Sequence, residues 1–306
     1  MSKRFKLKGS TKKAKSTRVR LKKPKLVIID GHSQLYRAFY SQAPDMSMHG
    51  IPTKVIYMFM QMMLATLKDL QPTHLAVCFD GPTKNLWRTD IYSDYKGNRD
   101  HSGDEFDDFY RQVDVVKDIL TALKIVHITG TKHEADDLIA TITTQGLHDP
   151  KLNIVIVSRD KDMEQLISER VIMFDPQDQT YRTAESVLET RGFGPELVTR
   201  FLAIAGDVSD NLPGIKGIGA VGAKKLLLEY NNFGNIYANL DKMTLGLRSK
   251  LEVARGDLPL FLQLVTLDKC AELPFSIDNL KITKPDYEAA RPLFKRYGFR
   301  KLTEYE

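Results

Sequence analysis

Cysteine and long apolar runs are scarce in this sequence of 306 residues. The two cysteines argue against a disulfide scaffold and a zinc site, and Cys78, within LAVCF, is expected to pack as a small buried hydrophobe. No apolar run approaches the roughly 20 residues that a membrane-spanning helix needs, so we expect no membrane partner. The basic N-terminus lacks the apolar segment of a secretory signal, which predicts a cytoplasmic location. The seven histidines show no metal-ligand spacing.

The basic charge is concentrated at one end of the chain. Residues 1–25 contain twelve Lys and Arg residues and no acid, which leaves 33 basic residues against 39 acids in the remainder. We expect residues 1–24 to form a disordered tail, because they contain almost no apolar side chains. Two readings of the tail stay open: a solubilising leader, or a segment that attracts nucleic acid without sequence preference.

Short runs rich in Val and Ile alternate with segments whose apolar residues recur at helical spacing. The expected strands cover 25–30, 73–80, 124–128, 153–158 and 170–174, and the expected helices between them cover 55–70, 109–123 and 134–147. This alternation predicts an α/β fold with a mostly parallel central sheet and helices on both faces. We assign the α/β core to residues 25–183, with a polar, aromatic and basic insertion at about 81–110, and a mostly helical region to residues 184–306.

Acidic residues follow several of these strands. Asp30 and Asp80 each end an apolar run, and the other acids form the clusters Glu134-Ala-Asp136-Asp137, Asp160-Lys-Asp162 and Asp207-Val-Ser-Asp210. The carboxyl ends of parallel strands meet at one edge of a sheet, so these acids are expected to lie close together. Two unit charges about 4 Å apart repel by roughly 4 kcal/mol at an effective dielectric near 20. Divalent cations such as Mg²⁺ or Mn²⁺ would offset that repulsion, which favours phosphodiester chemistry.

Each acidic cluster taken alone has a simpler explanation. Glu134, Asp136 and Asp137 open an expected helix, where acids cap free amides and interact favourably with the helix dipole. Asp207 and Asp210 are three residues apart, so on a helix they would share a face at a solvated helix end. The joint occurrence of acids after at least three strands is what favours a metal site.

Two basic segments accompany the acids. A hairpin between two helices is expected at 211–226, where glycine amides and lysines would bind a phosphate backbone without reading bases; its residues are Gly214, Lys216, Gly217, Gly219, Lys224 and Lys225. A plain turn between helices is the alternative. In the insertion, Tyr95, Lys96 and Arg99 would neutralise phosphate charge and stack on bases, or would form a solvated basic loop.

Six motifs in this chain occur in the order and spacing of the 5′ nuclease family: IIDGHSQLYRAFY, VCFDG, YKGNR, HEADDLIA, SRDKDMEQL and GDVSDNLPGIKGIGAVGAKKLL. Over about residues 25–295 the chain resembles the 5′–3′ exonuclease domain of bacterial DNA polymerase I and stand-alone phage flap endonucleases. The resemblance implies a structure-specific 5′ nuclease with a helical arch over its active site. Such an enzyme hydrolyses DNA at flaps, 5′ ends or branched junctions with two divalent ions.

The resemblance also implies a role for each motif residue. The first metal cluster would comprise Asp30, Asp80, Glu134, Asp136 and Asp137, and the second Asp160, Asp162, Asp207 and Asp210. Lys96 and Arg99 would contact the scissile phosphate, Tyr95 would stack on the neighbouring base, and Arg37 would assist near the first metal. The hairpin would bind duplex DNA, with a K⁺ ion held by its backbone carbonyls. A monomer that acts in DNA replication or repair, with replication proteins as further partners, is expected.

Two other functions are compatible with parts of this sequence. One is a noncatalytic DNA-binding protein that uses only the hairpin and the tail, against which the complete set of nine acids argues. The other is a ribonuclease with a related acidic α/β core, against which the insertion and the hairpin argue. Cleavage of a flap with and without Mg²⁺, and of RNA against DNA flaps, separates the three.

Overall fold

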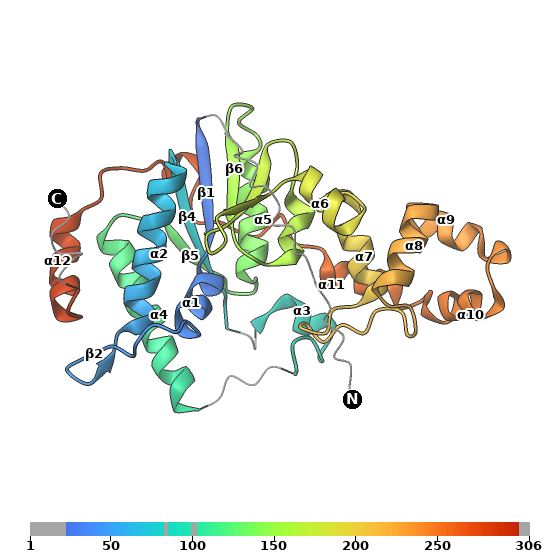
Figure 1. Cartoon of the computed structure of the whole chain (residues 1–306), viewed down its shortest axis with the longest axis horizontal. Coiled ribbons are helices and arrows are strands. Elements are labelled where there is room, and N and C mark those ends of the chain that lie inside the picture. Colours follow the sequence, from blue (N-terminus) through green and yellow to red (C-terminus); the bar gives the residue numbers. More distant parts are fainter. Residues whose placement is uncertain (1–22, 83–84, 99–102, 300–306) are drawn as a thin grey trace, which may run out of the picture.

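The computed structural model describes residues 23–82, 85–98 and 103–299. The basic tail over residues 1–22 and the predicted site residue Arg99 lie outside these described residues. The centre of the described fold is a six-stranded sheet in the order β5-β4-β1-β6-β7-β8 (Figure 1). The strands are β1 Lys25–Asp30, β4 His74–Phe79, β5 His127–Thr129, β6 Asn153–Val157, β7 Val171–Asp175 and β8 Thr180–Arg182, with a separate hairpin of β2 Ser47–Met48 and β3 Ile51–Pro52.

All pairings among β5, β4, β1, β6 and β7 are parallel, and β8 runs antiparallel to β7. The alternation along β1 explains the two faces of the sheet. Val27 and Ile29 pack into one hydrophobic core, while Leu26 and Ile28 pack into the other. A strand that is buried on both faces reads as a continuous apolar run, as KLVIID does. The predicted α/β fold is therefore confirmed.

Helices cover both faces of the sheet. They are α1 Gly31–Phe39, α2 Lys54–Leu70, α3 Trp87–Ile91, α4 Asp104–Ala122, α5 Ala135–Gly146, α6 Ala184–Arg191, α7 Val198–Ala205, α8 Ala220–Tyr230, α9 Phe233–Ala238, α10 Leu245–Ala254, α11 Leu258–Val265 and α12 Tyr287–Arg296, with 3₁₀ helices η2 Lys161–Leu166, η3 Pro195–Leu197, η4 Leu240–Lys242 and η5 Ile277–Leu280. Helices α1, α2, α4 and α12 share the core of Val27, whereas α5, α7 and α8 share the core of Leu26. No helix in the described ranges is long and apolar enough to span a membrane.

The chain after residue 184 divides into two parts in space. Helices α8–α10 form an arm that extends from the body, as Figure 1 shows at the right. Helix α12 lies at the opposite end, because Ala290 and Phe294 on its buried face, together with Phe299 just beyond it, pack into the core that contains α4. Within the expected helical region 184–306, this last helix is thus attached to the α/β core rather than to the arm.

Candidate active site at the carboxyl edge of the sheet

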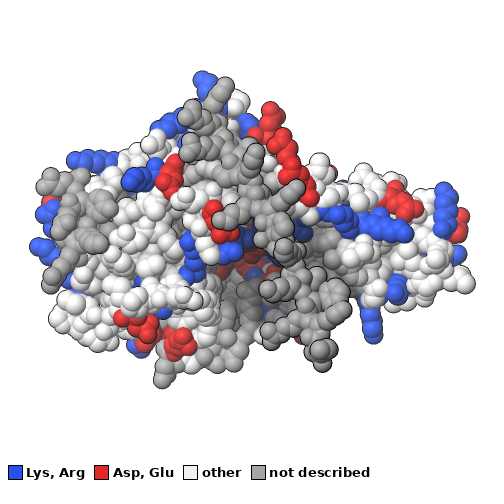
Figure 2. Space-filling view, viewed as in Figure 1, with Lys and Arg blue, Asp and Glu red and all other residues white. Residues whose placement is uncertain are grey.

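The predicted acids collect at the carboxyl edge of four neighbouring strands, β5, β4, β1 and β6. Asp30 ends β1, Asp80 follows β4, and Asp160 follows β6. Glu134 and Asp136 follow β5, because Glu134 is the N-cap of α5. Figure 2 shows acidic side chains in a recess between the body and the arm, with Lys and Arg side chains along the arm.

Asp30 is held in place by the elements on either side of it. The Ser33 amide at the start of α1 donates to its Oδ1 at 3.0 Å, and the Ser158 hydroxyl after β6 donates to its Oδ2 at 2.7 Å. The Asp160 amide in turn donates to the Ser158 hydroxyl at 3.1 Å. Burial raises the pKa of Asp30 to about 7, and the charges of Asp80 and Asp160 add to the effect.

Asp80 is fixed between α1 and α5. The Ala135 amide donates to its Oδ1 at 2.8 Å, so Asp80 satisfies a free amide at the start of α5. The Asp80 amide donates to Nδ1 of His32 at 2.8 Å. His32 therefore takes part in the site, although the histidine spacing had given no sign of it.

Asp136 and Asp162 show that the two predicted acid clusters are electrostatically connected. Burial raises the pKa of Asp136 well above its usual value, and the charges of Asp160 and Asp30 raise it further. Burial also raises the pKa of Asp162 well above its usual value, with Asp160, Asp207 and Asp210 as the next causes. Both side chains remain partly accessible to solvent. The carboxylates of the two clusters thus repel one another in one half-buried recess.

Tyr95 and Lys96 of the insertion reach the same acids. The Tyr95 hydroxyl lies within hydrogen-bond distance of two carboxylates, 2.8 Å from Glu134 Oε2 and 3.0 Å from Asp210 Oδ2. The Lys96 ammonium forms an ion pair with Glu134 and lies 3.6 Å from Asp210 Oδ1. Burial alone would raise the pKa of Glu134, but Lys96 and Arg88 outweigh burial and lower it. The Tyr95 side chain is buried, with 4% of the residue exposed, so its hydroxyl rather than a free ring face serves the site here.

Asp137 is the predicted acid that the structure does not bring to the recess. It is 0% exposed, and its carboxylate accepts two hydrogen bonds of 2.7 Å from Arg88 and one of 2.8 Å from the Asp268 amide. Arg88, which is 2% exposed, also donates to Glu134 Oε2 at 2.9 Å and to the carbonyls of Leu264 and Thr266. Arg88 therefore joins α3, the start of α5 and the end of α11 around a buried bidentate pair.

No pattern in the residues around Arg88 indicates this role. It lies in a polar, basic segment that reads as a solvated insertion, and its partners at Leu264 and Thr266 are more than 170 residues away in the chain. Ser158, by contrast, directly follows β6 and lies two residues before the predicted Asp160, and this position is a usable signal for an acid-binding hydroxyl.

Asp207 and Asp210 lie on a loop rather than on a helix. Helix α7 ends at Ala205, because Gly206 adopts φ 78° and a Cβ there would lie 2.5 Å from the Leu212 carbonyl oxygen. The backbones of Asp207 and Leu212 exchange two hydrogen bonds, which closes the turn. The expectation that a helical face carries both acids is wrong at this point. Asp210 still reaches the recess through Tyr95 and Lys96, and the charge of Asp207 acts on Asp162.

The loop that carries Asp207 and Asp210 is tied to the insertion. The Lys96 amide donates to the Asp210 carbonyl at 3.0 Å, and the Asn211 side chain donates to the Asp94 carbonyl at 2.7 Å. The Asn98 side chain donates to the Val208 carbonyl at 2.9 Å. These bonds fix the base of the insertion against the second acid cluster.

The predicted hairpin forms between α7 and α8. Gly214 is buried at φ 59°, and a Cβ there would lie 2.3 Å from the Gly206 amide nitrogen, so this glycine serves backbone packing. Gly217 is exposed at φ 81°, and Lys250 donates to its carbonyl oxygen at 2.9 Å. Gly219 is the exposed N-cap of α8. Lys216 and Lys225 are exposed and Lys224 is partly exposed, so the hairpin and the first turns of α8 present cations to solvent.

Two cavities flank the recess. The first, the arch cavity, has a volume of about 740 Å³ and is lined by Asp80, Lys96 and Glu134 together with Tyr110 and Lys117 of α4. The second lies between α1, α2 and the segment after β6, has a volume of about 690 Å³, and includes Arg37 and Arg159. Arg37 lines this second cavity and not the arch cavity, and no contact in the described structure joins it to the carboxylates of the first cluster.

The donor chemistry of the recess fits hard divalent cations. In the described parts of the chain, no three His, Cys, Asp or Glu side chains stand in position to hold a metal ion together. Mg²⁺ is usually bound by only one or two carboxylates and keeps several waters. The raised pKa values of Asp30, Asp136 and Asp162 mean that a cation would relieve the repulsion among them.

Two family models match consecutive parts of the chain. The 5′–3′ exonuclease N-terminal resolvase-like domain matches residues 25–192, and the 5′–3′ exonuclease C-terminal SAM fold matches residues 193–288. This chain belongs to the 5′–3′ exonuclease family. The predicted family is confirmed, and the chain is accordingly an enzyme, a metal-dependent nuclease of the 5′–3′ exonuclease type.

Named relatives of this nuclease agree with the family assignment. The 5′–3′ exonuclease of Aquifex aeolicus is 35% identical over 277 residues, which are 90% of this chain and 93% of that protein. DNA polymerase I of Caldicellulosiruptor bescii is 33% identical over 297 residues, and the match covers 92% of this chain but only 34% of the polymerase. The nuclease thus spans about a third of the length of that polymerase.

Solved structures share the fold of this nuclease. A complex of the bacteriophage T5 D15 flap endonuclease with DNA and metal ions aligns with a TM-score of 0.67 at 20% identity, over 92% of this chain and 100% of that one. The catalytic core of Rad2 in complex with DNA aligns with a TM-score of 0.60 at 17% identity, over 91% of this chain and 90% of that one.

Proposed function

We propose that this nuclease is structure-specific and cuts DNA at 5′ flaps and 5′ ends with two Mg²⁺ or Mn²⁺ ions. The observation that supports this most directly is the convergence of carboxylates from four adjacent strands in one half-buried recess. The pKa of Asp30 rises to about 7, chiefly through burial and further through the charges of Asp80 and Asp160, and this is an electrostatic cost of the recess. Binding of divalent ions offsets this cost.

Eight acids are assigned to the ions by their position. Asp30, Asp80, Glu134 and Asp136 serve the first ion, and Asp160, Asp162, Asp207 and Asp210 serve the second. When bound, two such ions activate a water molecule and stabilise the leaving oxygen of a phosphodiester. Asp137 has a different task in this proposal, because Arg88 already occupies both of its carboxylate oxygens.

Tyr95 and Lys96 orient the acids and then serve the substrate. The Tyr95 hydroxyl and the Lys96 ammonium both hold Glu134 and Asp210, which belong to different clusters. A phosphate that enters the arch cavity meets the Lys96 ammonium, which neutralises the charge that develops on the phosphate oxygens. Arg99 is proposed to share this task from the same insertion.

The hairpin holds duplex DNA beside the recess. The exposed glycine backbone at Gly217 and Gly219 allows close approach to phosphates, and Lys216, Lys224 and Lys225 add positive charge. A K⁺ ion bound by hairpin carbonyls is part of the proposal. The solved complexes of the T5 and Rad2 enzymes with DNA support flap or junction substrates for this chain.

The enzyme is proposed to act as a monomer in the cytoplasm of a bacterial or phage-infected cell, on DNA during replication and repair. Replication proteins are proposed as further partners. The relatives named DNA polymerase I support this setting, because they join a domain of this family to a polymerase in one chain.

The test is cleavage of 5′-labelled flap DNA with and without Mg²⁺, combined with two neighbouring substitutions. Asp136→Asn is expected to raise the Mg²⁺ concentration needed for half-maximal rate while the melting temperature is retained. Asp137→Asn is the matched control one residue away, and it is expected to lower the melting temperature by weakening the pair with Arg88. The assignment is overturned if Asp136→Asn leaves the Mg²⁺ dependence unchanged. A 5′ strand of RNA in the same flap measures the preference between RNA and DNA.

A further inference from the structure

Residues 264–268, at the end of α11 and just beyond it, are bonded to the elements that carry both acid clusters. We call this segment the strap. Helix α11 ends at Val265, and the last four carbonyls of a helix have no partner within that helix. The carbonyls of Leu264 and Val265 instead accept hydrogen bonds from side chains that lie close to the acids. A helix end with no acid in the recess thus becomes an attachment point for the elements that form the recess.

The strap is bonded to the first turn of α5, beside the first acid cluster. Nε of Arg88 donates to the Leu264 carbonyl at 2.8 Å, while its Nη1 and Nη2 donate to Asp137. The Asp268 amide donates to Asp137 Oδ1 at 2.8 Å. Asp136 directly precedes Asp137 in this turn, so its position is fixed relative to the strap.

Gln165 bonds the same strap to the second acid cluster. It lies in η2, three residues after Asp162. Its Oε1 accepts from the Leu267 amide at 3.0 Å, and its Nε2 donates to the Val265 carbonyl at 3.1 Å and to the Asp162 carbonyl at 2.9 Å. A backbone amide only donates and a carbonyl only accepts, so these partners fix the orientation of the Gln165 amide. One side chain therefore connects the backbone of a proposed metal ligand to the strap.

The neighbouring residue Glu164 holds the opposite side of η2. It is 3% exposed and forms ion pairs with Arg182 of β8 and Arg191 at the end of α6. Neither β8 nor α6 bears any of the eight acids assigned to the ions. Glu164 thus fixes η2 to elements outside the recess, whereas Gln165 fixes it to the segment that also anchors the first cluster.

A tie between the clusters matters because their carboxylates repel one another. Burial raises the pKa of Asp136, and the charge of Asp160 raises it further. This repulsion acts to widen the recess. Two-ion sites hold their ions about 3.5–4 Å apart, so a small displacement of one cluster changes the spacing that the chemistry needs.

We propose that Gln165 is a positioning residue for the metal pair, because it holds the second acid cluster to the strap that anchors the first. In this way it sets the spacing of the two ions. Groups that orient metal ligands without touching the metal typically contribute about 10- to 100-fold in metal affinity or activity. This inference rests on the proposed two-ion function and adds to it the residue that determines the distance between the ion sites.

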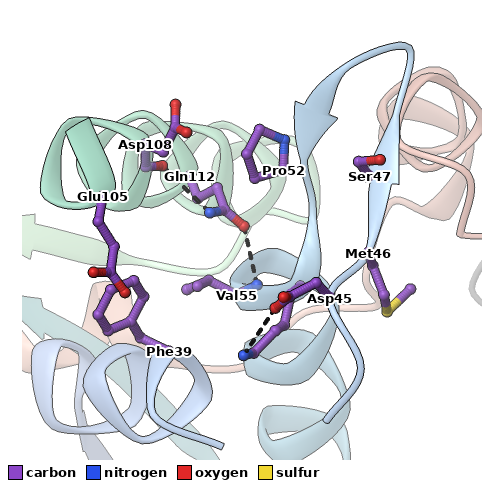
Figure 3. Close-up of a pocket in the computed structure, with 10 residues that line it drawn as sticks. Phe39, Asp45, Met46, Ser47, Pro52, Val55, Glu105, Asp108 and Gln112 are labelled. Atoms are coloured by element: carbon purple, nitrogen blue, oxygen red, sulfur yellow. Dashed lines mark hydrogen bonds and ion pairs between the residues drawn. The ribbon is translucent and has the colours of Figure 1, made fainter.

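The test variant is Gln165→Met, which keeps the length of the side chain and removes its hydrogen bonds. Gln112→Met is the matched control. Gln112 is 5% exposed, and its amide also bonds two backbone groups, the Val55 amide at 3.0 Å and the Asp108 carbonyl at 3.3 Å. Figure 3 shows this glutamine beside a cavity of about 460 Å³ between β2–β3 and α4, which none of the eight assigned acids lines.

Electron paramagnetic resonance of the Mn²⁺-loaded enzyme reads the ion pair independently of turnover. Two neighbouring Mn²⁺ ions are magnetically coupled, whereas isolated ions are not. The enzyme is bound to a synthetic copy of the DNA product of flap cleavage. The wild type and Gln112→Met are expected to give the coupled signal, and Gln165→Met is expected to give chiefly the signal of isolated ions. Gln165→Asn, whose shorter side chain cannot reach the strap and Asp162 together, is a second variant with the same expected result.

A Mg²⁺ titration of single-turnover cleavage gives the second measurement. Gln165→Met is expected to need about tenfold more Mg²⁺ for half-maximal rate, while its melting temperature stays close to that of Gln112→Met. A wild-type coupled signal in both Gln165 variants overturns the positioning role, and so does an equal change in Gln112→Met. A wild-type enzyme that shows only isolated Mn²⁺ overturns the two-ion function itself, and the role of Gln165 with it.

Discussion

Substitution of Asp30 by asparagine should stabilise the metal-free enzyme while it removes a proposed metal ligand. Asp30 is 5% exposed, and its pKa rises from 3.8 to about 7 in the folded chain, chiefly through burial. In the unfolded chain its pKa is close to 3.9. Between about pH 4 and pH 7 the unfolded state therefore releases a proton that the folded state keeps, and folding stability falls as pH rises.

The size of the effect follows from the same shift. Three pKa units at 1.36 kcal/mol each amount to about 4 kcal/mol of stability, fully present below pH 4 and lost by pH 8. Asparagine cannot ionise, and it still accepts the Ser33 amide hydrogen bond. We expect Asp30→Asn to raise the free energy of unfolding by about 3 kcal/mol more at pH 8 than at pH 5, in EDTA.

Urea unfolding at both pH values measures this difference, with Asp45→Asn as the matched control because the Asp45 side chain is fully exposed. The control is expected to change stability by less than about 1 kcal/mol at either pH. Added Mg²⁺ should then stabilise the wild type more than Asp30→Asn, because a ligand that binds only the folded state raises its stability. An Asp30→Asn variant that is destabilised equally at pH 5 and pH 8 would refute the reasoning. Asp30 would then matter only as the acceptor for Ser33 and Ser158.

Three further predictions concern residues around the recess. Asp160→Asn combined with Asp162→Asn should end cleavage while DNA affinity persists or rises, because repulsion of phosphate falls; near wild-type turnover in saturating Mg²⁺ would contradict this. Lys96→Ala should lower the single-turnover rate more than the affinity for DNA. Gly217→Val, at φ 81°, should instead weaken duplex binding, and its cleavage rate should recover at saturating DNA. Equal losses of rate and affinity in both variants would contradict these separate roles. Arg88→Ala should destabilise the enzyme by about 3–5 kcal/mol in urea unfolding, since it leaves Asp137 buried without its cation. An unchanged unfolding midpoint would exclude a stabilising role for the buried pair of Arg88 and Asp137.

Local patterns in the sequence were sufficient for the five parallel strands and for most of the acids, whereas the antiparallel edge strand β8 was not predicted. A strand buried on both faces must read as a continuous apolar run, so β1, β4, β6 and β7 were visible in the residues alone. Because parallel strands end at one edge, the acids after β1, β4, β5 and β6 had to meet. The buried state of Cys78, at 0% exposure, followed from the same reasoning.

Only the tertiary structure separated Asp136 from Asp137. Both acids lie in the first turn of α5 and are equivalent as helix-opening residues, but neighbouring positions on a helix face different directions. One side chain faces the recess, and the other meets Arg88, whose remaining partners come from residues 264–266. The sequence sets which residues share a face, whereas the partner that a face meets depends on elements far away in the chain.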